Sequence, residues 1–244
     1  TFMQIDTAIW AYVAPKNREA VRLAVANAVE ALLDGAKPGS DSQLQYARAF
    51  ANNAVTPAQF DRLKAMLDGS VNGLTVDAEL RWYLFLCGVK RGVFGPTEIA
   101  AEGDLDKTAH GKQYVAYAHA AIPTKEAKVA AFKSVTTDDL SNTIHSYKCR
   151  GFNENIHWEL LEGFVDQYFD SILKVWETKG FEIAETTATL TFPTWAISEA
   201  TVTKAQHWLD VTGKDASHAL RRSVTEGRDA MTRALKARAV DATR

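Results

Sequence analysis

The chain has 244 residues, of which 46% are hydrophobic and 24% are charged, a balance typical of a soluble globular protein with a sizeable core. Its 28 Lys and Arg residues are matched by 30 Asp and Glu residues without any run of like charge, which argues against nucleic acid as a partner. No window approaches the roughly 18 to 20 apolar residues that a membrane-spanning helix needs, and residues 1–10 lack the pattern of a signal peptide. We therefore expect a cytoplasmic protein with no membrane partner.

The two cysteines, Cys87 and Cys149, lie within apolar helical patterns that are far apart in the sequence. This placement favours two buried thiols in a reducing compartment over a disulfide framework.

Helical periodicity runs through the whole chain, and helix stop signals recur at regular intervals. Pro15 suits the first turn of a long helix, and Gly35 can close that helix in the left-handed conformation. The apolar face of this helix is expected at Val21, Val25, Ala28 and Leu32.

The next helices are predicted from their caps. In the first half, Asp41 can cap a helix through residue 51, Thr56 one that ends at Gly69, and Asp77 an apolar, central helix over 78–91. In the second half, caps are expected at Thr124, Thr136, Ser198 and Asp215. The longest helix is expected over 154–178, and 186–192 is predicted to be helical although its Thr-rich sequence alternates like a strand.

Two blocks of this pattern are similar to each other. Each has a proline-initiated helix, a short turn and an amphipathic helix, and the blocks end in Lys90-Arg91-Gly92-Val93-Phe94 and Lys148-Cys149-Arg150-Gly151-Phe152. A degenerate repeat of helix pairs predicts one all-α domain over 1–244, built from stacked αα-hairpins that form a HEAT-like right-handed solenoid or bowl.

The sequence contains no recognisable catalytic constellation. A zinc peptidase helix needs two histidines four residues apart, whereas the six histidines here lie nine or more residues apart. His157 with Glu159 or Glu162 is the nearest approach to a ligand cluster, and we interpret it as ordinary helix surface. Cys149 could have a lowered pKa beside Lys148 and Arg150, but a small residue packed at a helix end is the favoured interpretation. We expect no catalytic residue and no metal site in this chain.

Five arginines are the candidate ligand-binding residues. They fall on or near predicted helix ends, where the concave wall of a solenoid can present a guanidinium to a carboxylate. The competing interpretation for each is a solvated charged surface. They are Arg81, Arg91, Arg150, Arg221 and Arg222.

The order and spacing of several short segments resemble the C-terminal helical domain of actinobacterial-type aminopeptidase N, which is shared with endoplasmic-reticulum aminopeptidases. The resemblance covers nearly the whole chain. It is carried by Pro38-Gly39-Ser40-Asp41-Ser42-Gln43-Leu44, Arg48-Ala49-Phe50-Ala51, Val76-Asp77-Ala78-Glu79-Leu80-Arg81-Trp82, Asp106-Lys107-Thr108 with Gly111, Pro123 and Lys128, Gly151-Phe152, Tyr168-Phe169 with Val175-Trp176, Phe192-Pro193, and Leu220-Arg221-Arg222 with Arg228, Arg233 and Ala234.

The resemblance implies a helical bowl that closes the substrate chamber of a zinc aminopeptidase and contacts the distal end of the peptide. The zinc and the catalytic residues would belong to a catalytic domain outside this chain, so the isolated chain should not hydrolyse peptides. Its partners would be that domain and the peptide. The alternative is a free-standing HEAT-like adaptor that binds a protein through its concave face.

Overall fold

The computed structural model describes residues 2–243, and within them every regular element is a helix. The prediction of an all-α chain is therefore confirmed, including the Thr-rich segment, which lies largely within α11. In chain order the elements are α1 (Phe2–Thr7), the π-helical turn η1 (Ala8–Tyr12), α2 (Pro15–Asp34), α3 (Asp41–Asn53), α4 (Pro57–Leu67), α5 (Ala78–Val89), α6 (Pro96–Leu105), α7 (Ala109–Ala121), α8 (Lys125–Thr137), α9 (Asn142–Phe152), the 3-10 turn η2 (Trp158–Leu160), α10 (Phe164–Thr178), α11 (Phe181–Leu190), α12 (Glu199–Asp210) and α13 (His218–Asp241).

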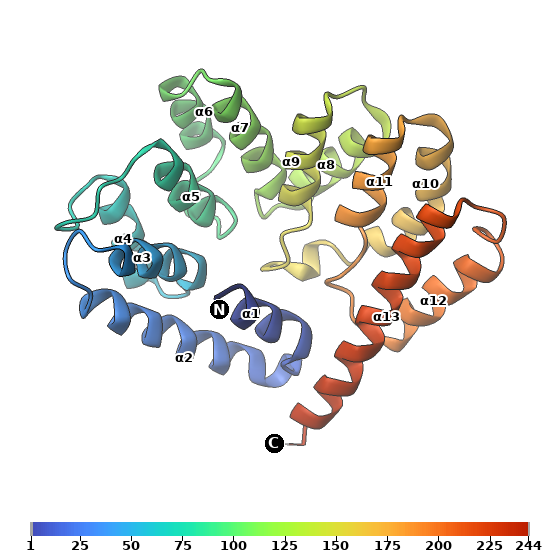
Figure 1. Ribbon diagram of the computed structural model, residues 1–244, viewed down its shortest axis with the longest axis horizontal. Coiled ribbons are helices and arrows are strands. Elements are labelled where there is room, and N and C mark those ends of the chain that lie inside the picture. Colours follow the sequence, from blue (N-terminus) through green and yellow to red (C-terminus); the bar gives the residue numbers. More distant parts are fainter. Residues whose placement is uncertain (1, 244) are drawn as a thin grey trace.

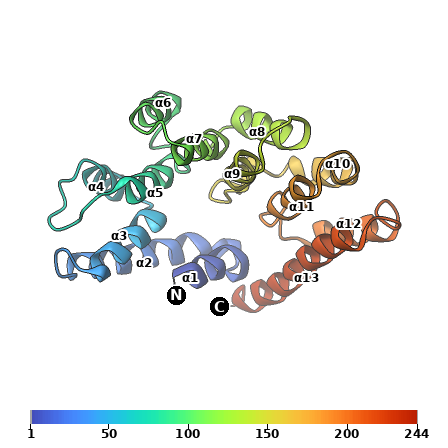
Figure 2. The same ribbon diagram turned by 45° about the horizontal axis from the view of Figure 1, so that its top comes forward.

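Six helical hairpins follow one another along an arc (Figure 1). Helices α3, α5, α7, α9, α11 and α13 each contact the next member of this series and form the inner layer, while α4, α6, α8, α10 and α12 lie outside (Figure 2). The buried apolar side chains accordingly form a series of clusters along the arc, from Val29 in the first hairpin to Met231 in the last. This is a solenoid-like arrangement, in which each hairpin packs mainly on its neighbours.

Several predicted helix ends are confirmed and others are corrected. Thr56 forms a reciprocal capping box with Gln59, and Asp77 and Ser198 accept backbone N–H groups as predicted. The caps of α3, α9 and α13 are instead Ser40, Ser141 and Ser217, replacing Asp41, Thr136 and Asp215. Thr136 lies inside α8, where its hydroxyl donates to the carbonyls of Phe132 and Lys133.

The buried face of α2 differs by one residue from the prediction. Val21 and Val25 are half-buried, Ala28 and Leu32 are exposed, and the buried residues are Ala26, Val29 and Leu33. Because this helix is apolar on most sides, its spacing alone cannot determine which face meets α3. Gly35 also differs from the prediction, because its φ of -81° is right-handed.

The expected long helix over 154–178 is present only as α10, and α13 is the longest helix with 24 residues. The cause is a tertiary contact between Phe152 and Phe164, whose rings lie 5.1 Å apart. A continuous helix between these residues would separate them by about 18 Å at 1.5 Å per residue. The chain forms the irregular segment 153–163 instead, and this segment extends into the centre of the arc (Figure 1).

Candidate functional site

Two adjoining cavities lie inside the arc, around the side chain of Trp10. The larger has a volume of about 640 Å³ and the smaller about 270 Å³, and both are lined by Trp10, Arg22 and Ile156. Their walls come from α1 and η1, the first turns of α2, the α3–α4 connection, the end of α5 and segment 153–163. Residues from distant parts of the sequence therefore build one site at the centre of the molecule.

The local structure around Trp10 follows from the break between η1 and α2. Val13 and Ala14 leave the helical conformation before Pro15 begins α2. Arg18, one turn into α2, reaches back and donates to the carbonyls of Ile9, Trp10 and Val13 at 3.3 to 3.5 Å. Its guanidinium also lies 5.5 Å from the centre of the Trp10 ring. Arg22, four residues further on, is on the same side of α2 because of the helical repeat.

Arg22 is the most unusual cation of the site. Its guanidinium lies 5.1 Å from the centre of the Trp10 ring, and among the described residues it has no hydrogen-bond acceptor or ion-pair partner. Burial lowers the pKa of Arg22, the nearby positive charges of Arg91 and Arg18 lower it further, and the negative charge of Glu19 opposes these effects. A guanidinium nevertheless stays protonated in proteins, so an anion bound here would compensate a half-buried charge.

Arg91 lies at the wall of the larger cavity but is held by the protein backbone. It donates to the carbonyls of Ala54 and Cys87 at 2.8 and 2.9 Å and also to that of Asn52. These bonds fix its guanidinium near Arg22 without neutralising it. The larger cavity therefore has a cationic side made by three arginines.

Apolar side chains form most of the rest of the larger cavity, which Glu19, Thr56 and His157 also line. Leu23 and Trp158 are 41% and 36% exposed, and they line it together with Val55, Phe60 and Ile156. An arginine cluster beside an apolar wall suits a ligand whose carboxylate is next to an apolar side chain.

In the smaller cavity the charged groups other than Arg22 interact with one another. Asn52 donates to Asp6 at 2.6 Å and accepts from Lys90 at 2.9 Å, and Lys90 lies 3.6 Å from Glu154, which accepts from Tyr117. Burial raises the pKa of Asp6, an effect that Lys90 and Arg91 oppose. This network ties α1, α3, α5 and α7 to segment 153–163.

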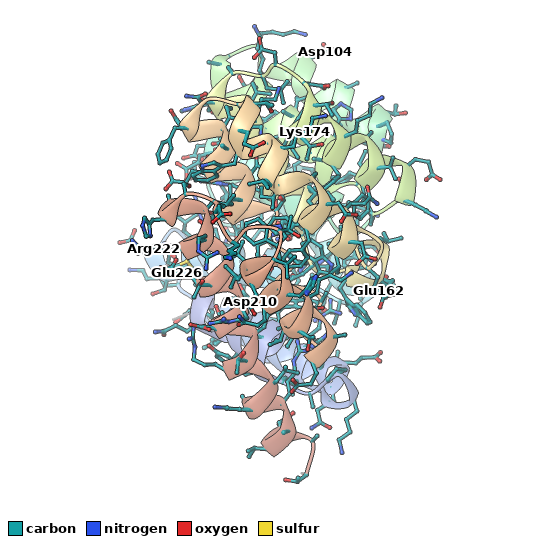
Figure 3. The ribbon with its side chains drawn as sticks, turned by 90° about the vertical axis from the view of Figure 1, so that its right-hand side faces the viewer. Asp104, Glu162, Lys174, Asp210, Arg222 and Glu226 are labelled. Atoms are coloured by element: carbon teal, nitrogen blue, oxygen red, sulfur yellow. The ribbon has the colours of Figure 1, made fainter. Side chains whose placement is uncertain are left out.

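The other predicted arginines lie elsewhere. Arg81 forms a two-bond ion pair with Glu102 at 2.5 and 2.6 Å, and Arg221 donates to the carbonyls of Leu209, Gly213 and Lys214. Arg222 pairs with Glu226 at the surface of α13 (Figure 3). Arg150 is exposed and lies over the ring of Tyr147. Ligand binding by these four arginines stays a prediction.

Of the cysteines and histidines, His157 lines the larger cavity, and its buried Nε2 has no hydrogen-bond partner among the described residues. Cys87 and Cys149 are buried free thiols, as expected, and burial raises the pKa of Cys149 to about 12. His157 lies 3.4 Å from Glu159, but within residues 2–243 there is no group of three His, Cys, Asp or Glu side chains arranged to hold a metal ion. In the same residues no helix is both long and apolar enough to cross a membrane.

Comparison with known proteins places the chain in a family. Residues 1–233 match the model of the ERAP1-like C-terminal domain. The chain is also 41% identical over 242 residues to aminopeptidase N of Streptomyces lividans, and the match covers 98% of this chain and 28% of that protein. The chain thus spans little more than a quarter of the length of this relative. It belongs to the family of ERAP1-like C-terminal domains.

Proposed function

We propose that this chain is the non-catalytic C-terminal domain of a zinc-dependent, cytoplasmic aminopeptidase. In this proposal it closes the substrate chamber and binds the distal end of the peptide, while a catalytic domain outside the chain holds the zinc and removes the N-terminal residue. The similarity to aminopeptidase N favours this role over a free-standing adaptor, because the chain matches 28% of a peptidase.

The observation that supports peptide binding is the half-buried guanidinium of Arg22, which has no acceptor among the described residues. The distal end of a peptide carries a carboxylate and a side chain next to it. In the larger cavity Arg22 would bind the carboxylate, with Arg18 and Arg91 adding positive potential, and the apolar wall would contact the last side chain. Arg91 is thus the one residue of the five predicted from sequence that we assign to this site.

The experiment compares a fluorescent decapeptide with a free C-terminal carboxylate and its C-terminal amide. Because hydrogen bonds to charged groups contribute about 1.5 to 3 kcal/mol, the acid should bind the chain at least about tenfold more tightly than the amide. Arg22→Met should abolish this difference, whereas Lys16→Met, at an exposed position of the same helix, should preserve it. Equal binding of acid and amide by the unmodified chain would rule out the proposed carboxylate site.

A further inference from the structure

The turn that carries Trp10 is held by residues from the far end of the chain. Arg238, near the end of α13, donates to the carbonyls of Trp10 at 2.8 Å, Ala11 at 2.9 Å and Ile197 at 3.3 Å. Arg18 also donates to Trp10, so two guanidiniums from opposite ends of the sequence meet at one carbonyl group. The last carbonyls of η1, which carry the negative end of the helix dipole, are thereby bound to cations.

Asp241 acts at the start of α2. Ala14, at the N-cap position of this helix, has no side chain that can cap it. The carboxylate of Asp241 accepts from the backbone N–H of Ala14 at 2.8 Å and from the side chain of Asn17 at 3.0 Å. A carboxylate from α13 thus accepts from the backbone N–H of the N-cap residue, as the N3 side chain does in a capping box, and its charge suits the positive end of the α2 dipole.

The contacts of Arg238 and Asp241 hold two segments, η1 and the start of α2, that both line the larger cavity. Arg18 and Arg22 lie in the first two turns of α2, and the Trp10 ring faces both guanidiniums. If η1 or the start of α2 moved, the ring and the two cations would separate from Arg91, which α5 and the α3–α4 connection hold in place.

We propose that Arg238 and Asp241 are positioning residues for the carboxylate pocket: they fix the Trp10 turn and the first turn of α2, and so set the geometry of Arg18 and Arg22. This inference rests on the proposed function for its ligand, but the positioning is a property of the chain itself. Because coupling between two sites is reciprocal, a peptide carboxylate in the pocket should in turn strengthen the closure between α13 and η1.

The test uses the acid and amide decapeptides with variants of the two residues. Arg238→Met and Asp241→Asn should lower the ratio of acid to amide affinity at least threefold, and Arg238→Lys, which keeps the charge, should recover part of it. The matched control is Arg233→Met, which removes an exposed cation of the same helix and should leave the ratio unchanged. A loss of affinity for both peptides with an unchanged ratio would overturn the proposal, because it would show only general destabilisation.

Hydrogen exchange at the amide of Ala14 separates this inference from the proposed function. The amide donates to Asp241, so its exchange should accelerate at least tenfold in Asp241→Ala and Arg238→Met and stay unchanged in Arg233→Met. If exchange accelerates but the unmodified chain does not distinguish acid from amide, the proposed ligand is wrong and the positioning role of Arg238 and Asp241 stands. If exchange is unchanged, the positioning role is wrong, whatever ligand the pocket binds. Asp241→Asn preserves the size of the side chain and serves if Arg238→Met fails to fold.

Discussion

Lys128 is a charged residue in the core, and its contacts explain why it is tolerated there. It is only 1% exposed, and its ammonium donates to the carbonyls of Ala120, Gly151 and Phe152 at 2.9 to 3.1 Å. These carbonyls belong to the last turns of α7 and α9, where helices leave acceptors unpaired. One amino group therefore satisfies the ends of two neighbouring helices.

Replacing this residue, Lys128→Met, should lower the free energy of unfolding by about 2 to 4 kcal/mol, because three buried acceptors lose their donor.

Burial lowers the pKa of Lys128 from 10.5 to about 8. The unfolded chain then binds more protons between these two pH values, so this group's contribution to stability rises with pH, and the difference from the Met variant should widen. Urea titrations at several pH values measure both effects. Lys133→Met, at an exposed position of the same helix, should change little; a loss as small for Lys128→Met would show that the carbonyls find other donors.

At the scale of the helices, the sequence predicted what depends on local contacts. Thr56 and Asp77 cap their helices through neighbouring backbone groups, and such signals are complete within a few residues. The break over 153–163 is different, because it depends on the packing of Phe152 against Phe164, and no pattern within the segment indicates that contact. The face of α2 was misassigned for the same reason, since only α3 decides which apolar side is buried.

Two helices of the inner layer, α7 and α9, approach each other closely at Gly151 of α9. A Cβ atom added to Gly151 would lie 2.3 Å from the carbonyl oxygen of Tyr117 and 3.0 Å from the Cβ of Ala120. Gly151→Ala should therefore push the two helices apart and destabilise the chain by about 1 to 3 kcal/mol.

Thermal melts measure this change, and Gly163→Ala is the control. Gly163 has a φ of -67° and no atom within 4 Å of an added Cβ, so alanine should be neutral or slightly stabilising there. If the two variants melted alike, the α7–α9 contact would have to be more deformable than its geometry indicates.

At the scale of the whole molecule, the site depends on closure of the arc, which sequence patterns do not reveal. Of the predicted arginines only Arg91 lines the larger cavity, whereas Arg18 and Arg22 were missed. Their spacing of four residues after Pro15 was a signal that they share a helix face. What the spacing could not show is that η1, α5 and segment 153–163 meet them inside the arc.

The last residues of α13 contribute more to the stability of the fold than their composition suggests. Because the first helices have the denser apolar sequence, truncation before Asp41 is expected to destabilise the fold more than removal of 237–244. That short deletion, however, removes Arg238 and Asp241, and with them the bonds to Trp10, Ala11 and Ala14. Figure 1 shows that η1 and the last turns of α13 lie next to each other at this junction.

Deleting 237–244 should therefore cost about 2 to 4 kcal/mol, since charge-assisted hydrogen bonds contribute about 1.5 to 3 kcal/mol each and part of the loss is recovered by water. For a chain of this size the melting temperature should fall by on the order of 10 °C. Limited proteolysis should locate the loosened region at η1 and the start of α2, whereas the inner helices α5, α7, α9 and α11 should stay protected. Deleting only residues 243 and 244 preserves Arg238 and Asp241 and should leave both measurements unchanged. If the two deletions behaved alike, the apolar packing of η1 would be sufficient to close the arc without these two charges.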